Sequence, residues 1–266
     1  MGIGIFVISL ERTKRRRSYI QSHLQSLNMN YTMVDAIDGM LVDEDVLYSQ
    51  ADMERVKQSP YWLTKGAIAC ALSHKKALDI FIDSRYDMAL ILEDDIVLPS
   101  NIESILSDIS RVIGSYDIVL LYYAALRKAF LSKKGGINTA SGSLLYPITL
   151  SQISTSSAYL IGKDSAKKLS QIIIPVSVAA DSWGHFYECN CFANVYLHYP
   201  LVLQTKDFKS SIEYFNGGFK SKLSNFIDTY KIPIFYQLLR YKRRLFRKRI
   251  TSQVYLTNEK SPYWHR

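Results

Sequence analysis

The sequence predicts an α/β fold built on a central, mostly parallel sheet, and three observations support this class. Aliphatic runs without polar alternation occur at residues 3–10, 89–92 and 117–123, and such runs are typical of strands that are buried on both faces. The segments between them place apolar residues at helical spacing. The 266 residues, 48% of them hydrophobic, are also enough to bury one full core.

The elements expected along the chain follow from the same patterns. Residues 41–62 have mixed polarity and no period, so we expect loop and short helix there. The polar stretch 133–136 reads as a loop that could cover a site. The other expected elements are strands at 3–10, 31–34, 89–98, 117–123, 155–161, 193–199 and 201–203, and helices at 12–27, 65–81, 102–113, 163–173 and 233–250.

The formal charge of +9 belongs to the C-terminal end of the chain. Residues 220–266 hold twelve of the 33 basic residues and two of the 24 acidic ones. We therefore expect a main domain at residues 1–219 and a basic, helical extension at residues 220–266. Such a basic segment can bind nucleic acid, bind an anionic membrane, or form a solvated face of a helix.

A helical wheel of residues 233–250 separates apolar from basic side chains. This pattern predicts either a helix in a membrane interface or one packed on the domain with a solvated basic face. The apolar side holds Phe235, Leu238, Leu239, Tyr241, Leu245, Phe246 and Ile250, and the basic side holds Arg240, Arg243, Arg244, Arg247 and Lys248.

Two further features bear on the cellular compartment. The apolar runs are far shorter than the roughly 20 residues that span a bilayer, and the first residues read as a core strand, so we expect a cytoplasmic protein. Cys70, Cys189 and Cys191 show neither a zinc nor a redox spacing, and we expect reduced, structural cysteines.

The strongest chemical signal is the acidic triplet Glu93-Asp94-Asp95, which ends a purely aliphatic run. The carboxyl ends of parallel strands are where such sheets bind ligands. Three adjacent carboxylates repel one another unless a cation lies among them, and Mg²⁺ or Mn²⁺ prefers oxygen ligands. The alternative is a solvated acidic turn after a core strand.

Other candidate groups lie on either side of this triplet. The basic cluster 11–17 follows the first strand, where it could meet a pyrophosphate or form a solvated helix face. His74 lies on an expected buried helix, where a core role is the usual one. Asp181, Trp183 and His185 combine a carboxylate, a ring and an imidazole, a group that can bind a sugar.

Several of these stretches together resemble glycosyltransferase family 25, the bacterial lipooligosaccharide glycosyltransferases related to the galactosyltransferase domains of collagen modification. The resemblance covers residues 3–205, with Ala67 and Ala69 as departures from the family pattern. It rests on the segment 7–12 with Arg16-Arg17, Asp35-Ala36-Ile37-Asp38-Gly39, Gly66 to Cys70 with Ser73-His74, Leu92-Glu93-Asp94-Asp95, Ala158-Tyr159, Asp181 and the segment 199–204.

The resemblance implies a GT-A-like sandwich that binds a nucleotide sugar and a divalent metal, Mn²⁺ or Mg²⁺. Asp95 would bind the metal directly, with Asp94 turned toward the metal or the ribose and Glu93 positioning both. Ser73 and His74 either reach the donor or pack in the core. The full set of donor-binding residues implied is Ser9, Arg12, Asp35, Ala36, Ser73, His74, Glu93 and Asp94.

The same resemblance implies an inverting transferase, which needs a base to deprotonate the acceptor hydroxyl. Asp181 is the candidate base, and the alternative is a helix N-cap. Trp183, His185 and Gln204 would line the acceptor site. A sugar-nucleotide pyrophosphorylase is another class that uses acids and a metal, but the expected glycine-rich loop is missing near the start.

The function expected is transfer of a hexose, galactose from UDP-galactose, to a lipid-linked oligosaccharide of lipooligosaccharide or lipopolysaccharide. UDP-glucose or UDP-N-acetylhexosamine are alternative donors, and nucleic-acid binding through the tail is the alternative from another class. The transferase reading implies no nucleic acid as partner. An anionic membrane is the expected further partner, which would place the enzyme peripherally on the cytoplasmic face of the inner membrane.

Overall fold

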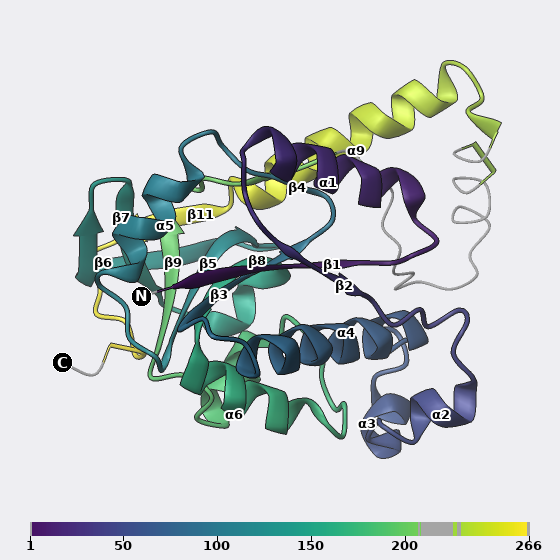
Figure 1. Cartoon of the computed structure of the whole chain (residues 1–266). Helices are drawn as coiled ribbons and strands as arrows, with labels where there is room; N and C mark the ends of the chain where they lie inside the picture. Colours follow the sequence, from purple (N-terminus) through teal and green to yellow (C-terminus); the bar gives the residue numbers. More distant parts are fainter. Residues whose placement is uncertain (1, 207, 209–225, 228–229, 265–266) are drawn as a thin grey trace.

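A mixed sheet forms the centre of the computed structural model, which describes residues 2–206, 208, 226–227 and 230–264. Its nine strands are arranged in the order β11-β6-β7-β9-β5-β8-β3-β1-β2 (Figure 1). They are β1 (Ile3–Ser9), β2 (Thr32–Asp35), β3 (Met88–Glu93), β5 (Asp117–Ala124), β6 (Ala129–Thr139), β7 (Gly142–Pro147), β8 (Ser154–Gly162), β9 (Asn194–Tyr199) and β11 (Val254–Thr257).

Most strands of this sheet share one direction, as predicted. The pairings of β1 with β2 and β3, of β5 with β9, and of β6 with β11 are parallel. Within the sheet described, β7 and β8 run against the other strands, because both pair with their neighbours in antiparallel register. The reversal of β8 has a consequence for the site: β8 begins at the edge where β1, β3 and β5 end.

Helices cover both faces of the sheet (Figure 1). Helices α4 and α6 pack on one face, and α1 and α5 pack on the other. The shorter α2 and α3 lie in the segment 41–62 before α4, where loop and short helix were expected. The helices of the described chain are α1 (Lys14–Ser26), α2 (Glu44–Tyr48), α3 (Met53–Gln58), α4 (Lys65–Ile82), α5 (Ile102–Ser110), α6 (Lys163–Ile173), α7 (Trp183–Glu188) and α9 (Phe235–Thr251), with a 3-10 turn η1 (Leu150–Gln152).

The continuous aliphatic run of β3 is explained by this layering. Ala89 and Ile91 join the core under α4, while Leu90 and Leu92 join the core under α1 and α5. Because alternate side chains of a strand point to opposite faces, both faces must be apolar. Beyond Glu93 the chain leaves the sheet and returns as β4 (Ile96–Val97), which pairs with β10 (Gln204–Thr205) in a small second sheet.

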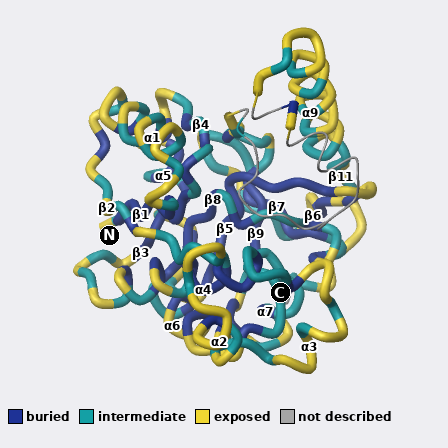
Figure 2. Tube along the Cα trace, turned by 90° about the vertical axis from the view of Figure 1, so that its right-hand side faces the viewer, coloured by how far each residue is buried: buried dark blue, intermediate teal, exposed yellow. Residues whose placement is uncertain are grey.

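The C-terminal segment contains the predicted helix and a strand that was not predicted. Helix α9 stands out from the body of the chain with largely exposed side chains (Figure 2). Strand β11 then pairs with β6, and Ser261 donates a hydrogen bond to the Pro147 carbonyl at 2.6 Å. The part after α9 therefore belongs to the sheet. The predicted boundary between residues 219 and 220 lies outside the described residues.

Two predicted elements were wrong. The stretch 133–136 is an irregularity inside β6, where the pairing with β7 shifts register between Ser132 and Ile137. Its polar side chains are explained by the outer position of β6 near the sheet edge, where they can face solvent. Residues 201–203 are not a strand, and pairing begins at Gln204. In the described chain no helix is long and apolar enough to cross a bilayer.

Candidate active site

The candidate site lies at the edge where β1, β2, β3 and β5 end. Ser9 and Asp35 are register partners at the ends of β1 and β2, and Ala36 N–H donates to the Ser9 carbonyl at 3.0 Å. Ala124 of β5 pairs with Ser154 at the start of β8. Chain direction therefore brings together residues that are far apart in sequence, as expected for a ligand site in a sheet of this class.

Asp94 is a buried carboxylate with donors at both oxygens. Its Oδ2 accepts a hydrogen bond from Ser9 Oγ at 2.7 Å and a longer one from Thr13 Oγ1 at 3.4 Å. Its Oδ1 accepts from Arg16 Nε at 2.6 Å. The side chain is thus fixed between β1 and the start of α1, on the α1 face of the sheet. This placement brings together Ser9 and Asp94, two residues predicted to bind the donor.

Asp95 differs from Asp94 because one of its oxygens lacks a partner. Arg16 Nη2 lies 3.1 Å from Asp95 Oδ2, whereas Asp95 Oδ1 is buried without a hydrogen bond to any described residue. Burial raises the pKa of Asp95, and Glu93 and Asp94 raise it further against the opposing charges of Arg16 and Arg247, to about 7. A buried, unpaired carboxylate oxygen is unfavourable unless a cation or donor joins it.

Arg16 contacts this acidic cluster, and the sequence did not predict it as a site residue. Its guanidinium lies between Asp94 and Asp95. Burial lowers the pKa of Arg16, but the charges of Asp95 and Asp94 outweigh this effect and raise it. The signal in the sequence was the basic cluster at the start of α1. Its cost against the helix dipole is offset here by ion pairs with the strand end.

Glu93 faces the other side of the sheet. Its Oε1 accepts a hydrogen bond from Ser156 Oγ at 3.3 Å and lies 3.8 Å from His74 Nε2 on α4. Burial raises the pKa of Glu93, but interactions with His74 and Arg16 outweigh it and leave the pKa below its ordinary value. The acidic triplet is therefore divided: Asp94 and Asp95 contact α1, and Glu93 contacts α4 and β8.

His74 and Ser73 both have packing roles. His74 is 3% exposed, and its Nδ1 lies 3.0 Å from the Tyr159 hydroxyl. Ser73 Oγ donates to the Ala69 carbonyl at 2.6 Å and accepts from Ile37 N–H at 2.8 Å. Ser73 therefore joins α4 to the turn 35–39. Neither side chain is exposed to the edge where Asp35 and Ala36 lie.

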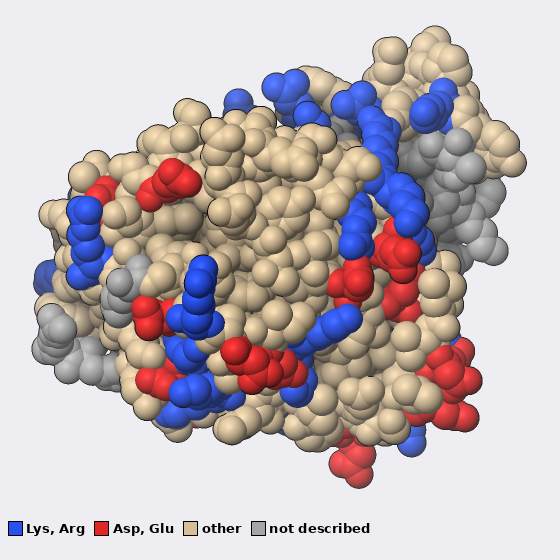
Figure 3. All heavy atoms as spheres, in the orientation of Figure 1, with Lys and Arg blue, Asp and Glu red and all other residues tan. Residues whose placement is uncertain are grey.

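The turn 35–39 is held by basic side chains of the N-terminal segment. Arg12 forms an ion pair with Asp38, and Arg17 Nη1 lies 2.6 Å from Asp35 Oδ1. Figure 3 shows basic side chains running beside acidic ones over α1 and β2. Because Asp35 is 61% exposed and pairs with Arg17, this turn offers both signs of charge to a ligand at the sheet edge.

Asp181 lies at the same edge through its contact with β8. Its Oδ2 accepts a hydrogen bond from Thr155 N–H at 2.8 Å, and Trp183 Nε1 donates to the Thr155 carbonyl at 3.2 Å. Thr155 has φ of 81°, a conformation that is rare for a β-branched residue and is often found at functional sites. The N-cap of α7 is Ser182 and no side chain bonds there, so the capping interpretation of Asp181 was wrong.

Asp181 and the acidic triplet also share an electrostatic neighbourhood. Burial raises the pKa of Cys70 well above its ordinary value, and the charges of Glu93 and Asp181 raise it further. Glu93 in turn raises the pKa of Asp95. Glu93 therefore interacts with both Asp95 and Cys70, and Asp181 also affects Cys70.

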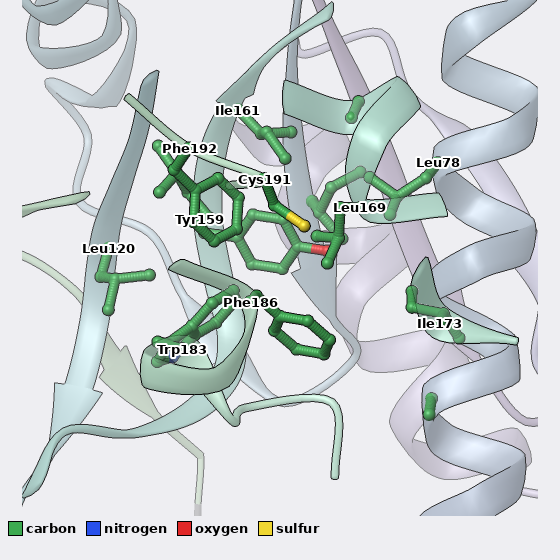
Figure 4. Packing of buried hydrophobic residues seen from close by; sticks show 14 of the residues in the cluster. Leu78, Leu120, Tyr159, Ile161, Leu169, Ile173, Trp183, Phe186, Cys191 and Phe192 are labelled. Atoms are coloured by element: carbon green, nitrogen blue, oxygen red, sulfur yellow. The ribbon is translucent and has the colours of Figure 1, made fainter. Parts of the chain in front are cut away.

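The predicted acceptor residues do not form one group. Trp183 is 1% exposed and packs against Tyr159 at a centroid distance of 5.4 Å (Figure 4), so its ring is a core residue and not an exposed sugar platform. The hydrophobic character of indole explains this placement. His185 contacts Cys189, with Nε2 3.7 Å from Sγ. Gln204 is exposed on β10, beside the strand that follows Asp95.

Four residues near Asp95 were not predicted. The Tyr122 hydroxyl lies 3.4 Å from Thr205 Oγ1, and burial and Asp95 raise the pKa of Tyr122. Lys206 N–H donates to the Asp95 carbonyl at 2.7 Å, and its own carbonyl accepts from Arg247 of α9 at 2.8 Å. Helix α9 thus reaches the site, which no local sequence pattern indicates.

The sequence matches the model of a known protein family. The model of glycosyltransferase family 25, described as an LPS biosynthesis protein, matches residues 3–183. The chain belongs to glycosyltransferase family 25. The matched region contains β1, the acidic triplet and Asp181, so the predicted family is confirmed, and Gln204 and α9 lie outside it.

Individual relatives show how far family 25 similarity extends. A putative glycosyltransferase of Haemophilus influenzae is 29% identical over 179 residues, covering 66% of this chain and 61% of that protein. Human procollagen galactosyltransferase 2 is 32% identical over 96 residues, which are 35% of this chain and 15% of that protein. The chain thus spans less than two thirds of these relatives.

The family also includes relatives described as inactive. The human inactive glycosyltransferase 25 family member 3 is 30% identical over 125 residues, covering 44% of this chain and 21% of that protein. Among solved structures, S. aureus TarS 1-349 shares 10% identity and a TM-score of 0.38 over 78% of this chain and 61% of that one, too low a similarity to assign the fold. Membership of the family therefore does not by itself establish that this chain is an active glycosyltransferase.

Proposed function

We propose that the chain transfers a hexose, galactose from UDP-galactose, to a hydroxyl of a lipid-linked oligosaccharide in lipooligosaccharide or lipopolysaccharide synthesis. The observation that carries this proposal is Asp95 Oδ1 at the end of β3, which is buried beside Asp94 and Arg16 without a hydrogen bond to any residue that the structure describes. UDP-glucose and UDP-N-acetylhexosamine remain alternative donors. A GT-A-like nucleotide-binding role is consistent with a site at the carboxyl ends of β1, β2 and β3.

The donor would lie along the ends of β1 and β2. The exposed Asp35 carboxylate and the Ala36 turn can accept and donate hydrogen bonds to a nucleoside. Arg12, whose side chain is 38% exposed, provides a cation for the diphosphate. Bidentate guanidinium groups match phosphate oxygens in geometry as well as charge. Ser9 supports the donor site indirectly, because its hydroxyl fixes Asp94.

The residues fit a divalent cation, with Asp95 as its ligand. Within the described part of the chain Asp95 Oδ1 is buried and unpaired, while both Asp94 oxygens already accept hydrogen bonds. Mg²⁺ typically binds one or two carboxylates together with substrate phosphates, so one free carboxylate oxygen beside a diphosphate is sufficient. Asp94 would join the metal only if Arg16 moved aside. When bound, Mn²⁺ or Mg²⁺ neutralises charge on the departing diphosphate.

Asp181 would act as the general base of an inverting displacement. The acceptor oxygen forms a bond to the anomeric carbon, the bond from that carbon to the UDP oxygen breaks, and the hydroxyl proton passes to Asp181. The Thr155 N–H bond holds one Asp181 oxygen and orients the carboxylate. Geometry of this kind is the first requirement for a base.

The acceptor class and membrane association are supported by α9. Its exposed side chains are both apolar and basic, with Leu238 57% exposed. Tyr236, Leu239, Arg243, Arg247 and Ile250 recur at helical spacing on the half-buried side. Apolar and basic side chains therefore occur on both sides of α9, so the separation predicted by the helical wheel was wrong. An outward face of apolar and basic side chains suits an anionic membrane surface on the cytoplasmic side of the inner membrane.

A donor panel tests the proposed reaction. The full chain is incubated with UDP-galactose, UDP-glucose or UDP-N-acetylglucosamine, with Mn²⁺ or with EDTA, and UDP release is measured. We expect release that requires Mn²⁺ and is fastest with UDP-galactose. Equal release in EDTA would contradict the metal requirement, and no release from any donor, with or without a lipooligosaccharide acceptor, would contradict the transferase.

A further inference from the structure

A second group of potential metal ligands lies on the α4 side of the sheet, apart from Asp94 and Asp95. Cys70 and His74 are one helical turn apart on α4, and Glu93 ends β3 opposite them. One ligand atom from each residue lies within 4.8 Å of the other two. Helical residues at i and i+4 share one face, so both side chains are directed to the same point.

His74 provides the observation that points to a ligand. Its side chain is 3% exposed, and Nε2 is buried without a hydrogen-bond partner among the described residues. The distance from Nε2 to Glu93 Oε1 is 3.8 Å, too long for a hydrogen bond. The other ring nitrogen is already engaged by the Tyr159 hydroxyl at 3.0 Å. A second partner at the other ring nitrogen is how protein histidines are oriented toward metals.

We propose that Cys70 Sγ, His74 Nε2 and a Glu93 carboxylate oxygen form a binding site for a thiophilic divalent cation of the Zn²⁺ class. Thiolate and imidazole ligands suit Zn²⁺, whereas Mg²⁺ and Mn²⁺ prefer oxygen. Bound Zn²⁺ keeps its ligand atoms roughly 3.3 to 3.7 Å apart, so the three atoms need to approach by at most about 1.5 Å. Three protein ligands leave a fourth position for water or a substrate oxygen.

The chemistry of the site requires loss of one proton. In the metal-free protein the Cys70 thiol is neutral at pH 7, because burial and nearby carboxylates raise its pKa. A coordinated thiol is deprotonated by the cation itself, so the proton leaves to solvent as the metal–sulfur bond forms. Cys70 and Glu93 then contribute two negative charges, which balance the divalent cation.

The alternative within the chain is the pair His185 and Cys189. Its Nε2–Sγ distance is 3.7 Å, and the two residues also lie one turn apart, His185 on α7 and Cys189 at its C-terminal cap. No third metal-binding group of the described chain joins this pair within the distances that define the Cys70 cluster. Cys189 therefore offers a matched control for Cys70.

The experiment titrates the metal-free full chain with Zn²⁺ in competition with a chromophoric chelator, and with Co²⁺ while recording the thiolate-to-cobalt absorption. We expect one Zn²⁺ per chain and a thiolate band. Cys70→Ser is expected to lose both, and Glu93→Gln to lose the one-to-one binding. Cys189→Ser and Asp95→Asn should retain both, and thermal melting verifies that each variant is folded.

Several outcomes would overturn the proposal. In the first, the wild-type chain binds no Zn²⁺ in competition with the chelator. In the second, folded Cys70→Ser binds Zn²⁺ as tightly as wild type. In the third, Cys189→Ser loses the thiolate band and Cys70→Ser keeps it. None of these outcomes depends on glycosyl transfer, so the metal site and the proposed transferase function can fail separately.

Discussion

Arg16 Nη2 lies 2.6 Å from Asp94 Oδ1, and this buried ion pair holds the first helix against the end of β3. The same guanidinium also reaches Asp95. Arg16 therefore supplies the positive charge that the sequence led us to expect from a metal alone. The positive charge of Arg16 partly neutralises the negative charge of Asp94 and Asp95 in the absence of a ligand.

We predict that Arg16→Gln lowers the free energy of unfolding by about 3 to 5 kcal/mol, the usual cost of removing one partner of a buried ion pair. Chemical denaturation in EDTA measures this change. Lys14→Gln is the control, since its side chain is 75% exposed and its ion pair among the described residues is with an exposed Glu11 at 3.7 Å. Equal stability of the two variants would show that Arg16 is not an essential counter-charge.

Asp95→Asn is predicted to stabilise the metal-free protein at pH 8. The pKa of Asp95 is raised to about 7 in the folded chain, above its ordinary value of 3.8. The folded state then binds more protons than the unfolded state between these values, so wild-type stability falls as pH rises through this window. The asparagine removes this penalty, which is on the order of a few kcal/mol.

Thermal melting in EDTA at pH 5 and pH 8 measures the effect. The difference in melting temperature between Asp95→Asn and wild type should be smaller at pH 5 than at pH 8, because most of the window between 3.8 and 7 lies above pH 5. A variant that melts below wild type at pH 8 would contradict the electrostatic account.

Asp181→Asn is predicted to lower kcat by at least about a hundredfold while donor affinity and melting temperature stay near wild type. The amide oxygen can still accept the Thr155 N–H bond, so the backbone contact survives. Asp181→Ala removes that contact as well and serves as the comparison for structural loss. Normal turnover in Asp181→Asn would limit Asp181 to orienting Thr155.

The outward face of α9 is predicted to bind anionic vesicles. Leu238→Glu with Leu245→Glu should reduce sedimentation with phosphatidylglycerol vesicles at low salt, because it removes apolar contacts and adds negative charge. Leu41→Glu with Leu126→Glu makes the same change at exposed leucines elsewhere. Truncation is a poor test, since it would remove β11 from the sheet. Equal loss in both double variants, or none, would contradict a role for this face.

The sequence predicted those parts of the fold whose signals are local. The aliphatic run of β3 and the helical spacing of α4 each reflect burial of that segment alone, and both were confirmed. Strands β6, β7 and β11 were missed because a mixed, half-exposed strand has no strong period. The path of Lys133 and Lys134 through β6 depends on pairing partners distant in sequence.

For the site, the sequence indicated the residues better than their roles. Ser9 and Asp94, both predicted to bind the donor, lie in contact because they follow adjacent parallel strands. Trp183 was assigned to the surface although its ring packs in the core, and polar neighbours in sequence gave no sign of its direction. Arg247 reaches the site from a helix more than a hundred residues beyond the triplet, a contact that only tertiary structure can reveal.

Binding of Mn²⁺ in the presence of UDP tests the central claim most directly. Electron paramagnetic resonance of free Mn²⁺, recorded during titration of the full chain, counts the ions bound. We predict one UDP-dependent Mn²⁺ for wild type and for the exposed-charge control Asp83→Asn, and its loss in Asp95→Asn. Asp95→Asn that binds Mn²⁺ and UDP as tightly as wild type would contradict a donor and metal site at the end of β3.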